Sequence, residues 1–314
     1  MKGDLVIEMF DIITIGSATI DVFVKTENEI RNHVKNGKTH EDVCYHLGEK
    51  LLVDELEFNT GGGGTNSAVA FSRLGLKTGY IGVLGHDEYA EKIVKELKNE
   101  GVEFLGKVKQ GKTGFSVILP APHDRVILSY KGVNNELLWK DIPMPLETKW
   151  LYISSMLGEG FRTIEMVSAW AKQNGIKVAV NLSLYLAERG LQEMKKLLNN
   201  SDILVLNKGE AQALTKKSHM KEMVETLNNY VNGVVVITDG KNPIHAISGG
   251  MHYMKEIGEV RAVDSTGAGD AFASGFVYGI MQGKGVESSL SCGCKEARSV
   301  LGNIGAKNIL LRNL

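Results

Sequence analysis

Short apolar runs alternate with segments of helical periodicity along most of the chain. Residues 12–16, 150–154 and 203–207 are dominated by apolar and β-branched residues, as expected of strands that are buried on both faces. Residues 87–100 instead place apolar side chains at positions i, i+3, i+4 and i+7, which is the spacing of one helix face. This alternation predicts an α/β fold in which helices cover both faces of a mostly parallel central sheet.

Two stretches interrupt this alternation. Residues 20–60 and 113–130 alternate apolar with polar positions, and the second stretch contains a turn at 120–124. We expect them to form a small antiparallel sheet, so that residues 1–314 make a single domain with a lid built from about 20–60 and 110–131. A lid excludes water from a reaction site, and the same surface is expected to join two copies of the chain as a homodimer.

Charge and cysteine content narrow the range of environments and partners. The chain has 314 residues, with 36 Lys and Arg against 37 Asp and Glu, so its net charge is −1. No bulk field favours nucleic acid or an anionic membrane, and nowhere do about eighteen apolar residues run together. The three cysteines, an odd number, favour a reducing compartment, and the N-terminus has acidic residues where a signal peptide needs an apolar core. We therefore expect a cytoplasmic protein that binds neither nucleic acid nor membrane.

The strongest chemical signal lies near the C-terminus, where Gly267, Ala268 and Gly269 precede Asp270 and an apolar run. Such a run is typical of a packed helix, whose first backbone N–H groups are unpaired and carry the positive end of the helix dipole. A phosphate can approach amides that no side chain covers, and Asp270 would place a base beside this anion hole. The alternative is a plain helix start at which Asp270 is only a cap.

Two glycine-containing stretches have different meanings. Residues 106–113 match the P-loop pattern letter for letter, but a strand pattern follows them where a P-loop requires a helix, so we reject a P-loop here. Residues 61–64 are four glycines that precede Asn66 at the start of a helical segment. They allow the backbone to approach a ligand to which Asn66 can hydrogen-bond; the alternative is a flexible turn.

Five motifs in register produce a family resemblance. They are a strand end at residues 16–21, a glycine segment at 61–70, an Asn-x-x-Glu element at 207–211, a Thr-Asp-Gly element at 238–240 and the segment 264–272. With them the chain resembles the PfkB family of carbohydrate kinases, the ribokinase-like sugar and nucleoside kinases, over nearly its whole length. The resemblance implies a ribokinase-like three-layer α/β/α fold with a small β-sheet lid. It also implies an ATP-dependent phosphotransferase that acts on a hydroxymethyl group of a sugar or nucleoside.

The same resemblance implies a role for each motif. Asp270 would take the proton of the acceptor hydroxyl, and the amides of residues 267–270 would hold the charge on the transferred phosphoryl group. Glu210 would hold Mg²⁺ through water. The other implied site residues are Asp21, Gly62, Gly63 and Asn66 for the acceptor, and Asn207, Thr238 and Gly240 for the nucleotide.

Gly63 marks a departure from ribokinases, which carry lysine at this position. This difference argues against ribose as the acceptor and leaves Arg125, His123 or Lys112 to replace that cation if the substrate is phosphorylated. A sugar-phosphate kinase, a vitamin-type kinase of the same fold and a catalytically silent ligand-binding protein are the alternatives.

The resemblance also implies two ion sites, one for a monovalent cation and the Mg²⁺ site at Glu210. Asp264 and Thr266 would contribute to a site for a monovalent cation such as K⁺, although the serine often found beyond residues 303–306 is not evident. Taken alone, Asn207 would be a helix cap and Glu210 an exposed carboxylate, and only the family pattern makes them nucleotide and metal ligands.

Overall fold

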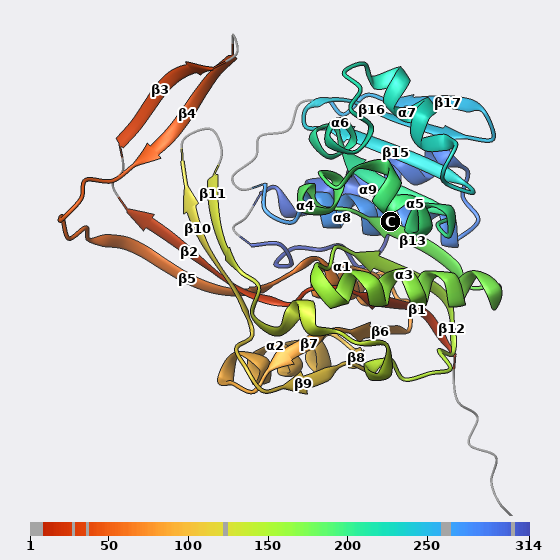
Figure 1. The fold of residues 1–314 in the computed structure, drawn as a ribbon, viewed down its shortest axis with the longest axis horizontal. Helices are drawn as coiled ribbons and strands as arrows, with labels where there is room; N and C mark the ends of the chain where they lie inside the picture. The colour runs from red at the N-terminus through yellow and green to blue at the C-terminus, as the bar shows by residue number, and fades with distance from the viewer. Residues whose placement is uncertain (1–8, 27–28, 36–37, 122–124, 259–264, 303–304) are drawn as a thin grey trace, which may run out of the picture.

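A nine-stranded sheet with helices on both faces forms the body of the protein (Figure 1). The computed structural model describes residues 9–26, 29–35, 38–121, 125–258, 265–302 and 305–314. In spatial order the strands are β17 (Met251–Lys255), β16 (Asn242–Ser248), β15 (Val234–Asp239), β14 (Ile203–Asn207), β13 (Lys177–Asn181), β12 (Thr148–Ser154), β1 (Phe10–Ile15), β6 (Thr78–Ile81) and β8 (Val102–Phe104). Neighbours from β15 to β8 are parallel, and β16 and β17 join antiparallel at one edge.

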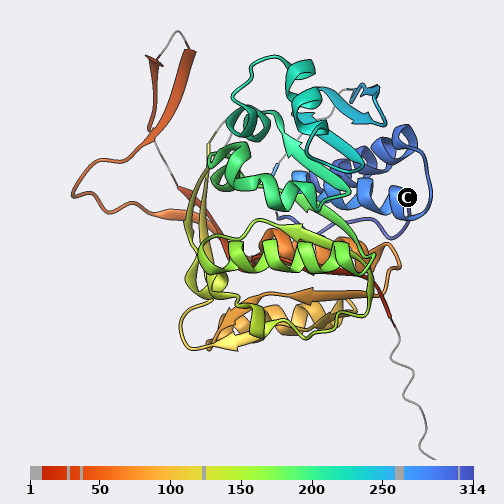
Figure 2. The same cartoon turned by 45° about the vertical axis from the view of Figure 1, so that its right-hand side comes forward.

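Nine α-helices are found among the described residues. They are α1 (Gly63–Arg73), α2 (Glu88–Asn99), α3 (Gly158–Gln173), α4 (Leu184–Ala187), α5 (Gly190–Asn199), α6 (Lys208–Thr215), α7 (Met220–Asn228), α8 (Ala268–Met281) and α9 (Val286–Val300). Side chains of α3, α5, α6 and α7 share one buried core, and those of α1, α8 and α9 share a second. Figure 2 shows helices on both sides of the central sheet. Because both faces of the sheet are covered, its central strands are mainly apolar and buried, and the predicted α/β architecture is confirmed. None of these helices is both long and apolar enough to cross a bilayer.

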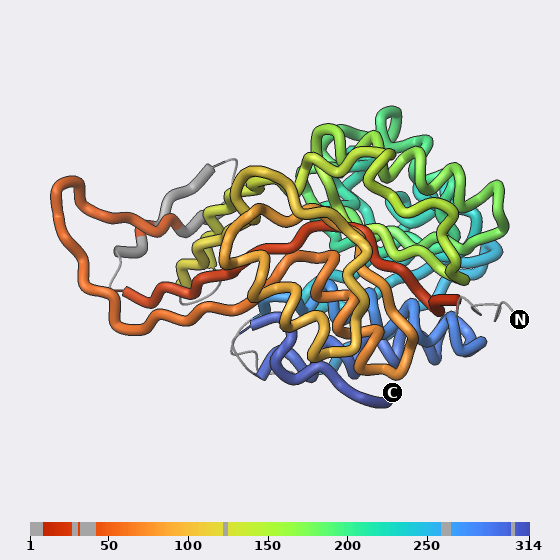
Figure 3. The backbone as a smooth tube through the Cα atoms, turned by 90° about the horizontal axis from the view of Figure 1, so that it is seen from below, coloured from red at the N-terminus to blue at the C-terminus, as the bar shows by residue number. Residues whose placement is uncertain are grey.

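A second, four-stranded sheet projects from this body (Figures 1 and 3). Its order is β11 (Arg125–Tyr130), β10 (Gly114–Pro120), β2 (Thr19–Thr26) and β5 (Val53–Gly61). We expected an antiparallel sheet, and this is wrong for one pair, since β2 and β10 run parallel. The reason is that both strands leave the body in the same direction, each returning through its own antiparallel neighbour, β5 or β11.

The remaining strands form two short ribbons. β3 (Glu29–Lys35) and β4 (Lys38–Cys44) pair with each other outside the four-stranded sheet, so that residues 20–60 do not all join one sheet as expected. β7 (Val83–Gly85) pairs with β9 (Lys107–Lys109). Because β9 leads into strand β10 and not into a helix, the rejection of a P-loop at residues 106–113 is confirmed. Two 3₁₀ helices, η1 (Gly132–Glu136) and η2 (Trp139–Asp141), connect β11 to β12.

Helices α8 and α9 approach so closely that a carboxyl group is enclosed between them and the C-terminal segment. Glu296 of α9 is fully buried, its Oε1 accepts a 3.3 Å hydrogen bond from the Leu311 amide, and its Oε2 has no partner among the described residues. Burial raises the pKa of Glu296 to about 7, from an ordinary value of 4.5. The folded protein therefore retains this proton at pH values where the unfolded chain has lost it.

We expect Glu296→Gln to stabilise the protein at pH 8. The raised pKa of Glu296 means that folding stability is lost as pH rises from about 4.5 to about 7 and then levels off. A neutral amide removes this loss, so the free energy of unfolding at pH 8 should rise by about 1–2 kcal/mol, with little change at pH 5. Urea denaturation at both pH values measures it, with exposed Glu188→Gln as the control. Equal pH dependence in variant and wild type would contradict the prediction.

Candidate active site

The glycine turn before α1 lies against two carboxylates. Gly62 has φ +97°, in the left-handed region, and a Cβ there would lie 2.5 Å from a backbone oxygen of the loop after β1. A Cβ on Gly61 would lie 1.9 Å from Oδ2 of Asp21, and one on Gly63 would lie 3.5 Å from Oδ1 of Asp270. The turn thus uses glycine for its backbone conformation and for close packing, and it brings Asp21 and Asp270 beside one loop.

Asp270 lies in the first turn of α8, where Gly267 occupies the N-cap position. Oδ2 of Asp270 accepts a 2.8 Å hydrogen bond from Nδ2 of Asn66 in α1. Burial raises the pKa of Asp270, and the hydrogen bond from Asn66 opposes that shift. The carboxylate is therefore engaged by another helix and does not cap its own, so the alternative of a plain cap is wrong.

The amides at the start of α8 differ in their partners. The N–H of Ala268 donates to the carbonyl of Ser265 at 3.2 Å. Those of Gly267, Gly269 and Asp270 have no hydrogen-bond partner within the described part of the chain. Three of the four amides predicted to form an anion hole are thus available to a ligand, at the positive end of the α8 dipole.

A cavity of about 370 Å³ opens beside Asp270 at the carboxyl ends of the central strands. Polar residues at or just beyond the ends of five strands line it: Ser17, Ser154, Asn181, Asn207 and Thr238. Ligands of open α/β sheets bind at this edge, because the loops that follow the strands converge there. The cavity therefore joins residues from both halves of the chain.

Asn207 and Glu210 form a reciprocal capping box at the start of α6. Oδ1 of Asn207 accepts from the Glu210 amide at 2.9 Å, and Oε2 of Glu210 accepts from the Asn207 amide at 2.8 Å. Both residues also line the cavity beside Asp270. Burial raises the pKa of Glu210 to about 7, and the Asp270 carboxylate adds to the shift. The capping function and a position in the site are therefore both realised.

A second cavity, of about 440 Å³, adjoins the first. The two share four lining residues, namely Asn207, Thr238, Ser265 and Gly269. Beyond these, the second cavity includes Gly240 and is mainly apolar, with the side chains of Ile244, Ile257, Phe272, Ala297 and Leu301. An apolar slot next to free helix amides suits a flat aromatic base whose phosphates lie at the amides.

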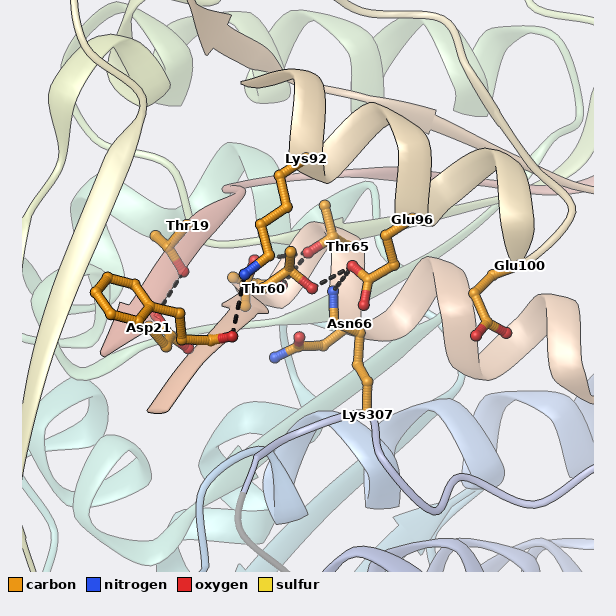
Figure 4. A network of polar contacts seen from close by, with 12 residues as sticks. Thr19, Asp21, Thr60, Thr65, Asn66, Lys92, Glu96, Glu100 and Lys307 are labelled. Carbon is orange, nitrogen blue, oxygen red and sulfur yellow. Dashed lines mark hydrogen bonds and ion pairs between the residues drawn. The ribbon is translucent and has the colours of Figure 1, made fainter. Parts of the chain in front are cut away.

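Asp21 of β2 is the second buried carboxylate beside the glycine turn, and it is not among the residues that line the first cavity. Its Oδ1 accepts a 2.8 Å hydrogen bond from the Thr19 hydroxyl (Figure 4). Burial raises the pKa of Asp21, and this hydrogen bond opposes the shift. Asp21 is 8% exposed, so few water molecules contact its carboxylate and an acceptor that binds there would displace few of them.

Behind these carboxylates, a buried ion pair ties the C-terminal segment to the second sheet. Nζ of Lys307 lies 2.8 Å from Oε2 of Glu96 in α2, and the Thr60 hydroxyl of β5 donates to the same oxygen (Figure 4). Ala306, the neighbour of Lys307, packs where a Cβ on Gly267 would fall. The segment that backs the anion hole is thus linked to the strand that leads into the glycine turn.

Sequence reasoning missed Ser154 and Lys131, both of which line the first cavity. Ser154 is 4% exposed, and its Oγ has no hydrogen-bond partner among the described residues. Its place at the carboxyl end of β12 is a signal that could have identified it, because ligands of parallel sheets gather at that edge. Lys131 follows β11, and no sequence pattern marked it.

Three cations were candidates to replace the lysine that ribokinases carry, and among the described residues the structure places only one of them in the wall of the first cavity. Arg125 lines the first cavity, and its Nη1 donates to the Ser265 hydroxyl. Lys112 is exposed and is not among the cavity-lining residues. His123 lies outside the described residues.

The two predicted ion sites are only partly described. Asp264 and residues 303–304 lie outside the described ranges, while Thr266 is buried beside Gly267. Within those ranges, no three Asp, Glu, His or Cys side chains gather as a metal site. A divalent cation at Glu210 would therefore need further oxygen ligands from water and from a bound phosphate, which suits Mg²⁺.

Comparisons with known proteins bear on the family and the fold. The profile of the pfkB family carbohydrate kinases matches residues 9–312. An uncharacterized sugar kinase of Archaeoglobus fulgidus is 27% identical over 252 residues, covering 78% of this chain and all of the relative. The ribokinase of Bacillus subtilis is 25% identical over 305 residues and 95% of each chain. In structure, the adenosine kinase of Sinorhizobium meliloti superposes with a TM-score of 0.83 at 22% identity, over 97% of this chain and 98% of that one.

Proposed function

Because the chain belongs to the pfkB family of carbohydrate kinases, we propose that it transfers a phosphoryl group from ATP to a hydroxymethyl group of a sugar or nucleoside. The observation that carries this proposal is the meeting of two cavities at the start of α8, beside the buried carboxylate of Asp270. One cavity suits a nucleotide, and the other is lined by polar groups that suit a hydroxylated acceptor. Phosphoryl transfer requires this juxtaposition of donor, acceptor and base.

In this proposal Asp270 takes the proton from the attacking hydroxyl. The hydrogen bond from Asn66 holds the carboxylate in place, and its raised pKa makes it a better base than an exposed aspartate. The free amides of Gly267, Gly269 and Asp270 stabilise the charge that develops on the phosphoryl oxygens. The enzyme therefore acts by positioning and by preorganised electrostatics.

The nucleotide assignments follow the two cavities, whereas only Gly63 of the acceptor residues lines one, and Asp21, Gly62 and Asn66 are assigned from their contacts at the glycine turn and with Asp270. Asp21, Gly62, Gly63 and Asn66 would bind the acceptor hydroxyls, and Asn207, Thr238 and Gly240 would bind the nucleotide. The shared lining residues lie at the junction where the phosphates would pass. The apolar side chains of the second cavity support a nucleobase there.

Mg²⁺ is the divalent cation that we propose for Glu210. When bound, it would neutralise charge on the nucleotide phosphates. We expect Glu210→Gln to raise the Mg²⁺ concentration for half-maximal rate about 10-fold, because the amide lacks the charge that orders the metal's water. Glutamine still accepts from the Asn207 amide, so the capping box persists. Rates across a Mg²⁺ titration measure the effect, with exposed Glu222→Gln as the control; an unchanged Mg²⁺ dependence would argue against this role.

The test of the proposed function is a coupled ADP-release screen. The acceptors are ribose, fructose, ketodeoxygluconate, common nucleosides, sugar phosphates and vitamin-type alcohols. If the protein is a kinase, the rate of ADP release rises with the concentration of at least one acceptor. A catalytically silent ligand-binding protein would bind an acceptor without releasing ADP. Absence of acceptor-dependent ADP release across the screen overturns the proposal.

The four-stranded sheet is proposed as a lid and as a homodimer interface. Strand register places Val22, Phe58, Val117 and Leu128 on one face, opposite to the face of Asp21. On that outer face Phe58 is 45% and Leu128 56% exposed. Val22 of the same row is buried in a core that it shares with α2, so the exposed apolar side chains of this row are Phe58 and Leu128. Exposed apolar side chains on a projecting sheet favour a protein contact, and a second copy would cover them symmetrically.

We expect Leu128→Asp to weaken the homodimer at least about 100-fold, because a charge on the exposed apolar part of the face would be buried in the interface. Size-exclusion chromatography with light scattering measures the mass over a dilution series. Met254→Asp is the control, since Met254 is 61% exposed on β17, away from the lid. A wild-type chain that stays monomeric at high concentration excludes this interface.

The monovalent-cation site and the cellular compartment remain predictions. A monovalent cation such as K⁺ would lie near Thr266 and Asp264. The cytoplasm is the compartment that the sequence favours.

A further inference from the structure

Lys131 places a positive charge in the wall of the first cavity, and a neutral sugar would form no ion pair with it. We propose that the acceptor is anionic, with a carboxylate or phosphate group that pairs with the Lys131 ammonium while the hydroxymethyl group at its other end faces Asp270. This inference rests on the proposed function, since it names the class of acceptor for the same site. Sugar acids and sugar phosphates share the required chemistry.

The backbone at Lys131 is well anchored. It stands at the N-cap of η1, where β11 returns from the lid to the body. Two residues further along, Val133 donates to the carbonyl of Lys112 at 3.0 Å. The Asn134 side chain then bridges both backbone groups of Ala18, accepting from N–H at 2.9 Å and donating to C=O at 2.8 Å. The lysine therefore projects from a fixed point of the cavity wall.

The ammonium of Lys131 has no counter-charge in contact with it. Its one described contact is the ring of Tyr185, whose centroid lies 5.1 Å away. No ion pair of Lys131 exists within the described residues. Burial lowers the pKa of Lys131, while the negative charge of Asp21 opposes that shift.

Two other largely buried cations among the described residues are paired with carboxylates. Lys307 lies 2.8 Å from Glu96, and Arg73 contacts Glu100 with two hydrogen bonds of 2.7 and 2.8 Å. A half-buried charge without a partner is costly, and an aromatic ring attracts a cation without neutralising it. A ligand anion would supply the missing charge at Lys131.

The two cations among the described residues of the cavity wall, Arg125 and Lys131, have different partners. Arg125 donates to Ser265, two residues before the helix cap of α8, which is the phosphoryl end. Lys131 instead interacts electrostatically with Asp21, the candidate acceptor ligand. Arg125 is thus placed to serve the transferred phosphate, which leaves Lys131 for the acceptor.

Matched pairs of acceptors test this inference. Glucose is compared with gluconate, and fructose with fructose 6-phosphate, because each pair keeps a free hydroxymethyl group and differs in charge at the far end. We expect kcat/KM to be at least about 10-fold higher for the anionic member of one pair, and the pair that responds tells a carboxylate from a phosphate.

Variants then connect the preference to Lys131. Lys131→Met should lower kcat/KM for the preferred anionic acceptor about 10- to 100-fold, with kcat/KM for neutral acceptors and KM for ATP within about 2-fold. Lys131→Arg should keep most of the preference, and Lys112→Met, which changes an exposed lysine outside the cavity wall, should keep all of it.

The outcomes separate this inference from the proposed function. If a neutral acceptor is preferred and Lys131→Met is without effect on it, the anionic acceptor is overturned and the kinase assignment stands. A rise in KM for ATP in Lys131→Met would assign the lysine to the nucleotide, which also overturns the inference. If no acceptor in this set or the wider screen gives ADP release that depends on Asp270, the proposed function itself fails.

Discussion

Asp270→Asn is expected to lower kcat at least about 10³-fold while ATP affinity stays within about 2-fold. The asparagine side chain has nearly the shape of the aspartate carboxylate. Its oxygen can therefore still accept the hydrogen bond from Nδ2 of Asn66, which is 2.8 Å long in the wild type. It has no affinity for the proton of the acceptor hydroxyl. The loss should therefore fall on the chemical step, which steady-state rates and a direct ATP-binding titration separate.

Asp202→Asn is the matched control for this substitution. Asp202 precedes β14, at the opposite end of the strand from Asn207, and its carboxylate contacts Lys177 and the Val178 amide. It repeats the same chemical change far from the cavity, so kcat should be unaffected. Turnover near the wild-type rate in Asp270→Asn, on a confirmed acceptor, would exclude Asp270 as the base.

Gly267→Ala is expected to lower kcat about 10²- to 10³-fold and to destabilise the fold by about 1–3 kcal/mol. Gly267 has φ +79°, and a Cβ there would lie 2.3 Å from Cβ of Ala306. Either the N-cap or the C-terminal segment must move, and the amides of Gly269 and Asp270 move with the cap. Rates and urea denaturation report the two consequences separately.

Gly283→Ala distinguishes the effect on the site from backbone strain. Gly283 follows the other end of the same helix, also in the left-handed region at φ +71°, but with open space around its Cβ position. Its substitution should cost about 1 kcal/mol of stability and leave kcat unchanged. If both variants lose activity equally, general weakening of α8 explains the loss and the anion hole does not.

The sequence was sufficient to predict the features that repeat locally. The apolar runs at 150–154 and 203–207 predicted buried parallel strands, and the structure confirms them as parts of β12 and β14. Helix α2 begins and ends where its periodicity indicated, with Asp87 accepting a 3.0 Å hydrogen bond from the Ala90 amide. Such elements can be predicted because burial of one face makes apolar residues recur at a fixed spacing within a single helix or strand.

Strand direction in the lid was predicted incorrectly because it depends on where each segment leaves the body. Alternating polarity in residues 20–60 and 113–130 indicates strands with one covered face. It does not determine which strands pair with each other or in which direction. The parallel pairing of β2 with β10 joins segments that are distant in sequence. Such pairing is decided by topology.

The sequence by itself determined the family, the order of the motifs and the residues Asn66, Asn207, Glu210 and Asp270 as candidates, because glycine spacing and helix-start chemistry are local. Tertiary structure alone decided that Asn66 holds Asp270, that Glu96 joins Lys307 of the C-terminal segment to Thr60 of the lid, and that Lys131 lines the cavity with no carboxylate in contact among the described residues. Each of these depends on burial and on contacts between distant segments. The charge balance of the site, which would select the acceptor, arises only when the chain is folded.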